Sequence, residues 1–204
     1  MPGERCSGDA ARRLGEEYLY QTLANENVEN LKRYRFRKVL AACPHCFNTI
    51  GNEYRQFGGE FEVVHHSVLI AQLVREGRLR LTRPREELLA YHDSCYIGRY
   101  NDIYDSPRAS LRAIPGLEVI DPPRSRNKGL CCGGGRRAHV DGDPRQASAS
   151  TRSASRSSSR RRPGPWAPHA RSASRWSTWA AKVKGAEDKL QVKDIAELVA
   201  EALE

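Results

Sequence analysis

The stretch that decides the fold is residues 38–46, Lys-Val-Leu-Ala-Ala-Cys-Pro-His-Cys. After Lys38, the four residues 39–42 form a short apolar run, and the stretch 38–42 is typical of a buried strand. Pro44 follows Cys43 and suits the first turn of a helix, where the missing amide hydrogen costs nothing. We therefore predict a strand over 38–42 and a helix over 44–57 that Gly58-Gly59 ends, with two cysteines at the start of the helix.

Strands and helices alternate on both sides of this stretch. Upstream, an approximate apolar stripe predicts a helix over 9–34. Downstream, the pattern predicts strands over 61–64, 88–91, 117–120 and 189–192, helices over 67–76 and 107–114, and a last helix from Ile195 that Asp194 and Glu197 cap. This alternation favours the α/β class with mainly parallel sheets.

The chain contains an internal repeat with an offset of 125 residues, because residues 70–74 resemble residues 195–199 and Cys6 corresponds to Cys131. We predict two pseudo-repeated, Rossmann-like cysteine-rich units, a partial one over residues 1–80 and a second over residues 81–204. The first copy lacks its opening cysteine, and the second lacks its closing Cys-x-x-Cys.

Residues 136–180 interrupt the second unit. The part from 136 to 176 holds ten arginines, no lysine and two acidic residues, and it has no Leu, Ile or Phe. Such a sequence cannot bury enough apolar surface to offset its ordering entropy, so we expect an irregular or disordered segment. It occupies the place where the α/β order requires a helix and a strand. Two explanations stay open: a genuine Arg/Ser-rich insert, or a shifted reading frame in which residues 169–173 can encode Cys-Pro-Phe-Cys.

The same segment carries +8 of the formal net charge of +9, so the rest of the chain is nearly neutral. The net positive charge is therefore confined to one segment and does not indicate a basic binding face, so we expect no nucleic-acid partner. No apolar run approaches the roughly 18–20 residues of a membrane span, and the N-terminus has no signal-peptide core. A cytoplasmic location is the default expectation.

Six cysteines are the candidate functional residues: Cys6, Cys43, Cys46, Cys95, Cys131 and Cys132. In a cytoplasmic protein such clusters indicate metal or redox chemistry more often than disulfides. Thiolates are natural ligands of iron. The free N–H groups of a helix start favour the thiolate form of the first pair. Adjacent thiols fit poorly around one tetrahedral ion but can reach different irons of a cluster. Each copy keeps only three cysteines, so a four-ligand cluster needs one more donor, and we expect incomplete clusters.

The sequence resembles the cysteine-rich CCG-domain proteins, which include the B subunit of heterodisulfide reductase and the iron–sulfur subunit of glycolate oxidase. The matching motifs cover about residues 4–135 and 188–204. They are Cys6-Ser7-Gly8-Asp9, Cys43-Pro44-His45-Cys46-Phe47-Asn48, Asn52-Glu53-Tyr54 with Gln56-Phe57-Gly58-Gly59, Val63-Val64-His65-His66, His92-Asp93-Ser94-Cys95-Tyr96-Ile97-Gly98-Arg99 and Cys131-Cys132-Gly133.

The resemblance implies paired domains that bind [4Fe–4S]-type clusters through these cysteines, in an oxidoreductase component with no residue in a catalytic role. It implies electron transfer among a flavin, further clusters and a quinone or thiol/disulfide substrate. The implied partners are a flavoprotein, other iron–sulfur subunits, or a quinone-linked membrane partner that would hold the chain at the membrane periphery. Relatives carry further ferredoxin-like clusters upstream, so the chain resembles the C-terminal part of a longer protein.

Three alternatives stay open. A thioredoxin-like thiol–disulfide oxidoreductase would use Cys43-Pro44-His45-Cys46, which follows a strand and opens a helix. A zinc-binding module would use the same Cys-x-x-Cys spacing. A nucleic-acid-binding protein would use the Arg/Ser-rich segment with strongly salt-dependent affinity. The first alternative explains two cysteines and leaves the other four, with the repeat, unexplained.

Overall fold

Two small parallel sheets organise the part of the chain that the computed structural model describes, residues 3–129, 166–167 and 192–203. In the first sheet, β1 (Val39–Ala41) pairs with β2 (Val63–His65). In the second sheet, β3 (Leu88–Tyr91) lies between β4 (Glu118–Ile120) and β5 (Trp166–Ala167). The predicted α/β class with parallel strands is confirmed. β5 supplies a strand where the α/β order requires one, and the other residues of 136–180 lie outside the described ranges, as do 189–191 of the predicted last strand.

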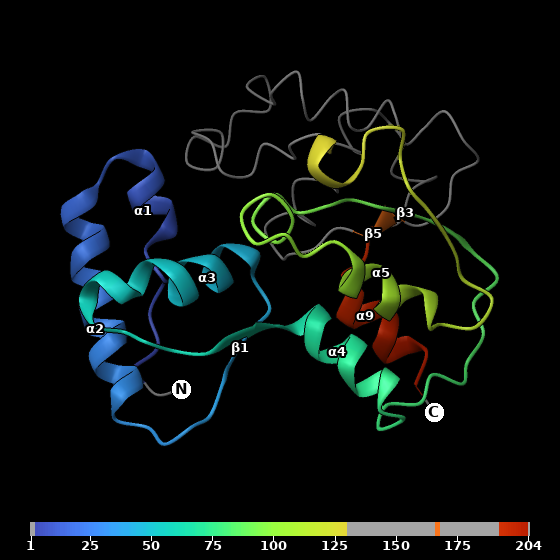
Figure 1. Cartoon of the computed structure of the whole chain (residues 1–204), viewed down its shortest axis with the longest axis horizontal. Coiled ribbons are helices and arrows are strands. Elements are labelled where there is room, and N and C mark those ends of the chain that lie inside the picture. Colours follow the sequence, from blue (N-terminus) through green and yellow to red (C-terminus); the bar gives the residue numbers. More distant parts are fainter. Residues whose placement is uncertain (1–2, 130–165, 168–191, 204) are drawn as a thin grey trace.

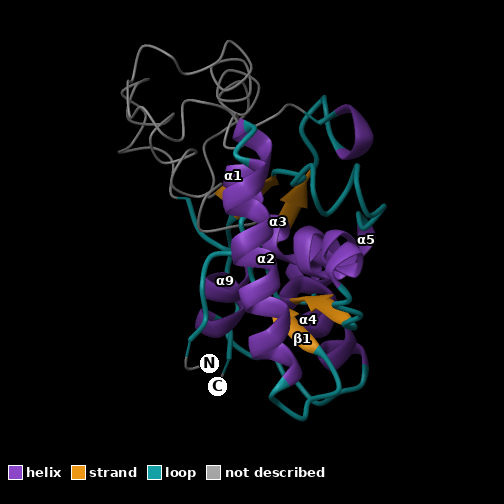
Figure 2. Cartoon of the chain, turned by 90° about the vertical axis from the view of Figure 1, so that its left-hand side faces the viewer, coloured by secondary structure: helices purple, strands orange, loops and turns teal. Residues whose placement is uncertain are grey.

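The helix predicted over 9–34 is divided into two helices, α1 (Asp9–Leu14) and α2 (Glu17–Lys32). The division occurs at Gly15, which adopts a φ of 90° in the left-handed region. Its N–H donates to the carbonyl of Arg12 at 3.1 Å, and the next N–H donates to the carbonyl of Ala11 at 2.9 Å. Glycine ends helices in this way because it has no Cβ to oppose a positive φ. Figure 2 shows α2 running the height of its half of the molecule.

The helix predicted over 44–57 is continuous in extent and irregular in geometry. α3 (Pro44–Asn48) widens into a π-helical turn at Thr49–Glu53 and then tightens into a 3₁₀ turn at Tyr54–Phe57. Gly58, at a φ of 70°, ends it as predicted. π-Helical turns inside helices occur frequently at functional sites.

The described residues form two hydrophobic cores. Near the N-terminus, α2 packs against the turn after α3 through Tyr20, Ala24, Val28 and Tyr54. The larger core joins β3 to α4 (His66–Arg75), α5 (Asp105–Arg112) and α9 (Ile195–Glu201), which lie together in Figure 1. None of the described helices is long and apolar enough to cross a membrane.

The predicted cap of the last helix is confirmed. Asp194 Oδ1 accepts the N–H of Ala196 at 2.8 Å, and Glu197 Oε2 accepts the N–H of Asp194 at 2.7 Å. This reciprocal box satisfies two of the N–H groups that a helix start leaves unbonded. It also fixes Ile195 and Leu198, both fully buried, in the larger core.

Asp194→Ala is expected to lower the free energy of unfolding by about 1 kcal/mol, because the start of α9 loses its side-chain acceptor. Asp194→Asn keeps an acceptor oxygen and should lose clearly less. Urea titration followed by circular dichroism measures both variants. Equal losses in the two variants would show that the contact of Asp194 with His66 Nε2, at 3.4 Å, matters more than the cap.

Candidate functional site

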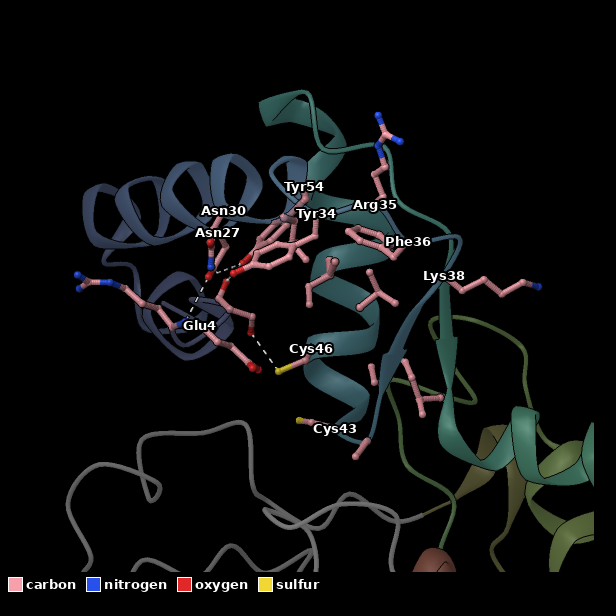
Figure 3. A pocket seen from close by; sticks show the side chains of 18 residues that line it. Glu4, Asn27, Asn30, Tyr34, Arg35, Phe36, Lys38, Cys43, Cys46 and Tyr54 are labelled. Carbon is pink, nitrogen blue, oxygen red and sulfur yellow. Dashed lines mark hydrogen bonds between the residues drawn. The ribbon is translucent and has the colours of Figure 1, made fainter. Parts of the chain in front are cut away.

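Cys43 and Cys46 lie one turn apart at the start of α3. Cys43 is the N-cap residue with extended backbone angles, Pro44 takes the first helical position, and Cys46 follows inside the first turn. Both side chains are partly buried. The Oγ of Ser7 lies 3.4 Å from the Sγ of Cys46, the contact drawn as a dashed line at Cys46 in Figure 3. The segment before α1 thus reaches the cysteine pair.

The hydrogen bond between the two thiols shifts their pKa values in opposite directions. A hydrogen bond from the Cys46 thiol is the main cause that lowers the pKa of Cys43 to about 7, with help from the backbone N–H groups of His45 and Cys46 against the effect of burial. The same hydrogen bond, together with burial, raises the pKa of Cys46. Cys43 is therefore the cysteine of the pair that ionises first, with about half of it in the thiolate form at pH 7, and the thiolate is both the metal ligand and the nucleophile.

A buried carboxylate orients the histidine between the cysteines. Asp9 is 6% exposed, and its Oδ2 lies 2.6 Å from His45 Nδ1. Arg13 Nε and Thr49 Oγ1 donate to the other carboxylate oxygen at 3.1 and 3.3 Å. Burial alone would raise the pKa of Asp9, but the hydrogen bond and charge of His45, with those of Arg13, outweigh burial and lower it. Asp9 is thus a fixed anion that holds His45 in place.

The backbone of the segment that contains Cys6 is anchored beside the pair by a buried polar network. Asn27 Nδ2 donates to the carbonyl of Cys6 at 2.9 Å, and the Tyr54 hydroxyl donates to the carbonyl of Ser7 at 3.0 Å. Asn27 also contacts the Tyr54 hydroxyl at 3.0 Å. The Cys6 side chain itself is exposed.

The turn that carries Cys95 packs against the turn that carries Cys43 and Cys46. The ring of Tyr96, the residue after Cys95, lies 4.1 Å from the ring of His45 between centroids. Asn101 lies under the same turn and donates to the carbonyl of Tyr96 at 2.6 Å and to Asn48 Oδ1 at 3.1 Å. The fold therefore brings together two cysteine motifs that are about fifty residues apart in the sequence.

A buried arginine holds the base of the Cys95 turn. Arg108 is 1% exposed and donates to both oxygens of Asp93, at 2.7 and 2.8 Å. It also donates to Asp121 Oδ1 at 2.9 and 2.6 Å. The backbone N–H of Arg126 reaches Asp93 Oδ2 at 2.6 Å. Asp93 is thus committed to structural contacts, and the network ties this turn to the loop after β4.

Arg99 connects the Cys95 turn to residues 127–129, which directly precede the Cys131-Cys132 motif in the sequence. Its guanidinium donates to the carbonyl of Asn127 at 2.9 Å and to the carbonyl of Gly129. Cys131 and Cys132 lie outside the described residues, so their predicted meeting with Cys95 stays a prediction. Within the described ranges, no group of three or more His, Cys, Asp and Glu side chains is placed to hold a metal ion.

The sequence identified the cysteines and missed the contacts that place them. Asp9, His45 and Tyr96 all stand inside the cysteine motifs, so motif membership was the available signal. Arg108 gave no such signal, because an arginine in a helix is usually a solvated residue.

Two buried histidines make the stability of this region depend on pH. Burial, with the charge of His66, lowers the pKa of His65 to about 3. Burial, with the charge of Arg99, lowers the pKa of His92 to about 4. Because both values lie below the ordinary value of 6.5, the unfolded chain binds more protons below pH 6.5. The folded state therefore loses stability as the pH falls from 6.5 toward 4.

We expect each histidine to contribute a loss of about 2 kcal/mol between pH 8 and pH 5, from the linkage of protonation to unfolding. His65→Gln and His92→Gln should each remove about that much of the pH dependence, whatever they do to the stability at pH 8. Urea titrations at both pH values give the comparison. An unchanged pH dependence in both variants would contradict the burial of neutral imidazoles.

The fold and these contacts define a protein class with cysteine side chains presented at helix starts and turns of an α/β scaffold, suited to iron or to thiol redox chemistry. The cysteine-rich domain family, CCG, matches residues 1–51 and 89–156, more than half of the chain. The chain belongs to this family, which confirms the resemblance seen in the sequence.

Relatives carry iron–sulfur and oxidoreductase names. The chain is 47% identical over 132 residues to a probable iron-sulfur-binding oxidoreductase, FadF, of Bacillus subtilis. This match covers 65% of the chain and 19% of the length of the relative. The chain is 46% identical over 132 residues to an EtfAB:quinone oxidoreductase of Syntrophomonas wolfei, covering 65% and 18%. It is 34% identical over 138 residues to one subunit of the dihydromethanophenazine:CoB--CoM heterodisulfide reductase of Methanosarcina mazei, covering 65% and 34%. The matched region thus spans about a fifth to a third of these relatives.

Proposed function

We propose that this chain is an electron-transfer part of an iron–sulfur oxidoreductase and binds clusters of the [4Fe–4S] type. The proposed ligands are Cys6, Cys43, Cys46, Cys95, Cys131 and Cys132. Support comes from the family match and from relatives that are named iron–sulfur proteins and oxidoreductases.

The observation that carries the proposal is the packing of two cysteine turns against each other through His45 and Tyr96. The donor chemistry fits iron, because the lowered pKa of Cys43 favours its thiolate form and Cys46 follows it on the same helical turn. A bound cluster would supply one-electron transfer. The protein would hold it through the thiolates, while Ser7 Oγ and the N–H groups at the start of α3 would hydrogen-bond sulfur and tune its potential.

The proposal extends to organisation and partners. Two cysteine-rich units, residues 1–80 and 81–204, would share the electron path, the second interrupted by residues 136–180. A flavoprotein or other iron–sulfur subunits would exchange electrons with the chain, in the cytoplasm or at a membrane beside a quinone-linked partner. The names of the relatives support subunit partners of this general kind.

Anaerobic purification tests the proposal. Iron and acid-labile sulfide are measured per chain, and the absorption and electron paramagnetic resonance spectra are recorded before and after reduction. Near-equal iron and sulfide with a paramagnetic signal after reduction is the expected result. Zinc in place of iron, or a colourless metal-free chain from iron-replete cells, would refute it.

A specific observation favours a second candidate, thiol–disulfide exchange at Cys43 and Cys46. A lowered pKa on the first cysteine and a raised one on the second is the pattern of a Cys-x-x-Cys redox site at a helix start. Iodoacetamide should then modify Cys43 selectively at pH 7 in the metal-free chain, and a Cys43–Cys46 disulfide should form reversibly. Selective modification without a reversible disulfide would leave the iron–sulfur role as the better account.

A further inference from the structure

β1 is an edge strand in the described part of the chain. Its described neighbour is β2, with Val39 beside Val63 and Leu40 beside Val64. The N–H of Val39 donates to the carbonyl of Glu62 at 2.9 Å, so the backbone groups of Val39 and Ala41 are directed toward β2. Alternation then directs the N–H and C=O of Leu40 to the opposite edge. That edge offers backbone hydrogen bonds to a further strand.

A pocket of about 670 Å³ lies along this open edge and reaches the cysteine pair. β1, the end of α2 and α3 surround it, with Cys43 and Cys46 at one end (Figure 3). Its lining is mostly apolar, including Leu31, Ile50 and Phe36. Leu40 and Phe36 are large apolar side chains that are 57% and 38% exposed. A strand edge beside apolar walls is the kind of surface to which an extended peptide adds.

The other half of the molecule contains the corresponding strand with this edge covered. The 125-residue offset maps Ala41 onto Trp166 and Ala42 onto Ala167, which are the two residues of β5. β5 lies parallel to β3, with Trp166 beside Ala90 and Ala167 beside Tyr91. β3 leads directly into the turn that carries Cys95. In the second unit, therefore, β5 corresponds to β1, and its parallel neighbour β3 leads into the turn that contains Cys95.

We propose that the open edge of β1 and its pocket form a docking surface for one strand of a partner polypeptide. The strand runs parallel to β1 and ends in a cysteine-bearing turn beside Cys43 and Cys46. The relatives contain polypeptide well beyond the matched region, which is 18–34% of their length in the three described above. A second copy of β1 does not meet the requirement, because two equal edges about a twofold axis pair antiparallel and bring no cysteine to this end. The pairing is independent of iron; only the role of the delivered cysteine rests on the proposed function.

The probe is a synthetic peptide of residues 86–97, which contains β3 and the Cys95 turn, added at millimolar concentration to the metal-free full chain. Amide exchange of Leu40, followed by NMR, should slow by about tenfold or more, whereas Val39 and Ala41, already directed toward β2, should change little. The control peptide carries Leu88→Pro and Ala90→Pro, which remove the backbone donors that β3 directs away from β4 and toward its neighbour β5. The control chain carries Leu40→Pro, which removes the donor of the open edge and leaves those toward β2.

Slowed exchange of Leu40 with the probe, lost with the control peptide, supports the docking surface. The control chain has no amide hydrogen at residue 40, so binding there is followed by NMR shifts, and the probe should leave the amide signals of Val39 and Ala41 unshifted. Unchanged exchange at Leu40 would overturn it, as would protection that appears without peptide and increases with chain concentration. Iron uptake tests the cysteine separately. The probe should raise the iron bound per chain, and the same peptide with Cys95→Ser should not. Slowed exchange without added iron would keep the docking surface and overturn the role of the delivered cysteine.

Discussion

Arg108→Met is expected to lower the free energy of unfolding by about 3–5 kcal/mol, one of the largest effects of a single substitution in this chain. The guanidinium is 1% exposed and neutralises Asp93, whose side chain is 4% exposed. Burial alone would lower the pKa of Arg108, but its hydrogen bonds and charge contacts with Asp93 and Asp121 outweigh burial and raise it. Without Arg108 the Asp93 carboxylate is left buried without its ion-pair partner, and that desolvation is the main cost.

Arg112→Met, on the exposed side of the same helix, is the matched control and should change the free energy of unfolding by less than about 0.5 kcal/mol. The double variant Arg108→Met with Asp93→Asn should recover part of the loss, because the uncompensated charge is removed. Denaturant titration at pH 7 measures all three variants. A double variant that is less stable than Arg108→Met alone would contradict this account.

The double variant Cys43→Ser with Cys46→Ser is expected to reduce the iron bound at the Cys43–Cys46 pair by at least about tenfold after anaerobic purification. The reason is that the oxygen of serine replaces the soft anionic sulfur donor. The fold should survive, since serine is close to cysteine in size and both side chains are only partly buried. Iron and sulfide analysis, with circular dichroism as the folding check, measures the effect.

Ser7→Ala is the matched control for that experiment. It removes the contact to the Cys46 sulfur and leaves every cysteine in place. It should keep its iron and shift the reduction potential, because hydrogen bonds to sulfur tune clusters without holding them. Unchanged iron in the double cysteine variant would assign the metal to other residues.

Local chemistry allowed much of the fold to be predicted from the sequence. The strand over 38–42, the helix start at Pro44, the stop at Gly58 and the cap at Asp194 each depend on neighbouring residues, and the structure has all four. The break at Gly15 was missed because an apolar stripe continues across it, and the left-handed turn of one glycine outweighs that pattern.

What the sequence by itself determined is therefore the kind of chemistry and the kind of scaffold: cysteines at helix starts and turns, on alternating strands and helices. Tertiary structure alone decided which of these motifs meet. His45 contacts Tyr96, and Arg108 is buried between Asp93 and Asp121. These residues are far apart in the sequence, and no helix or strand periodicity predicts that they meet. The physical reason is that these contacts depend on how whole elements pack, whereas caps, turns and strand patterns depend on a few successive residues.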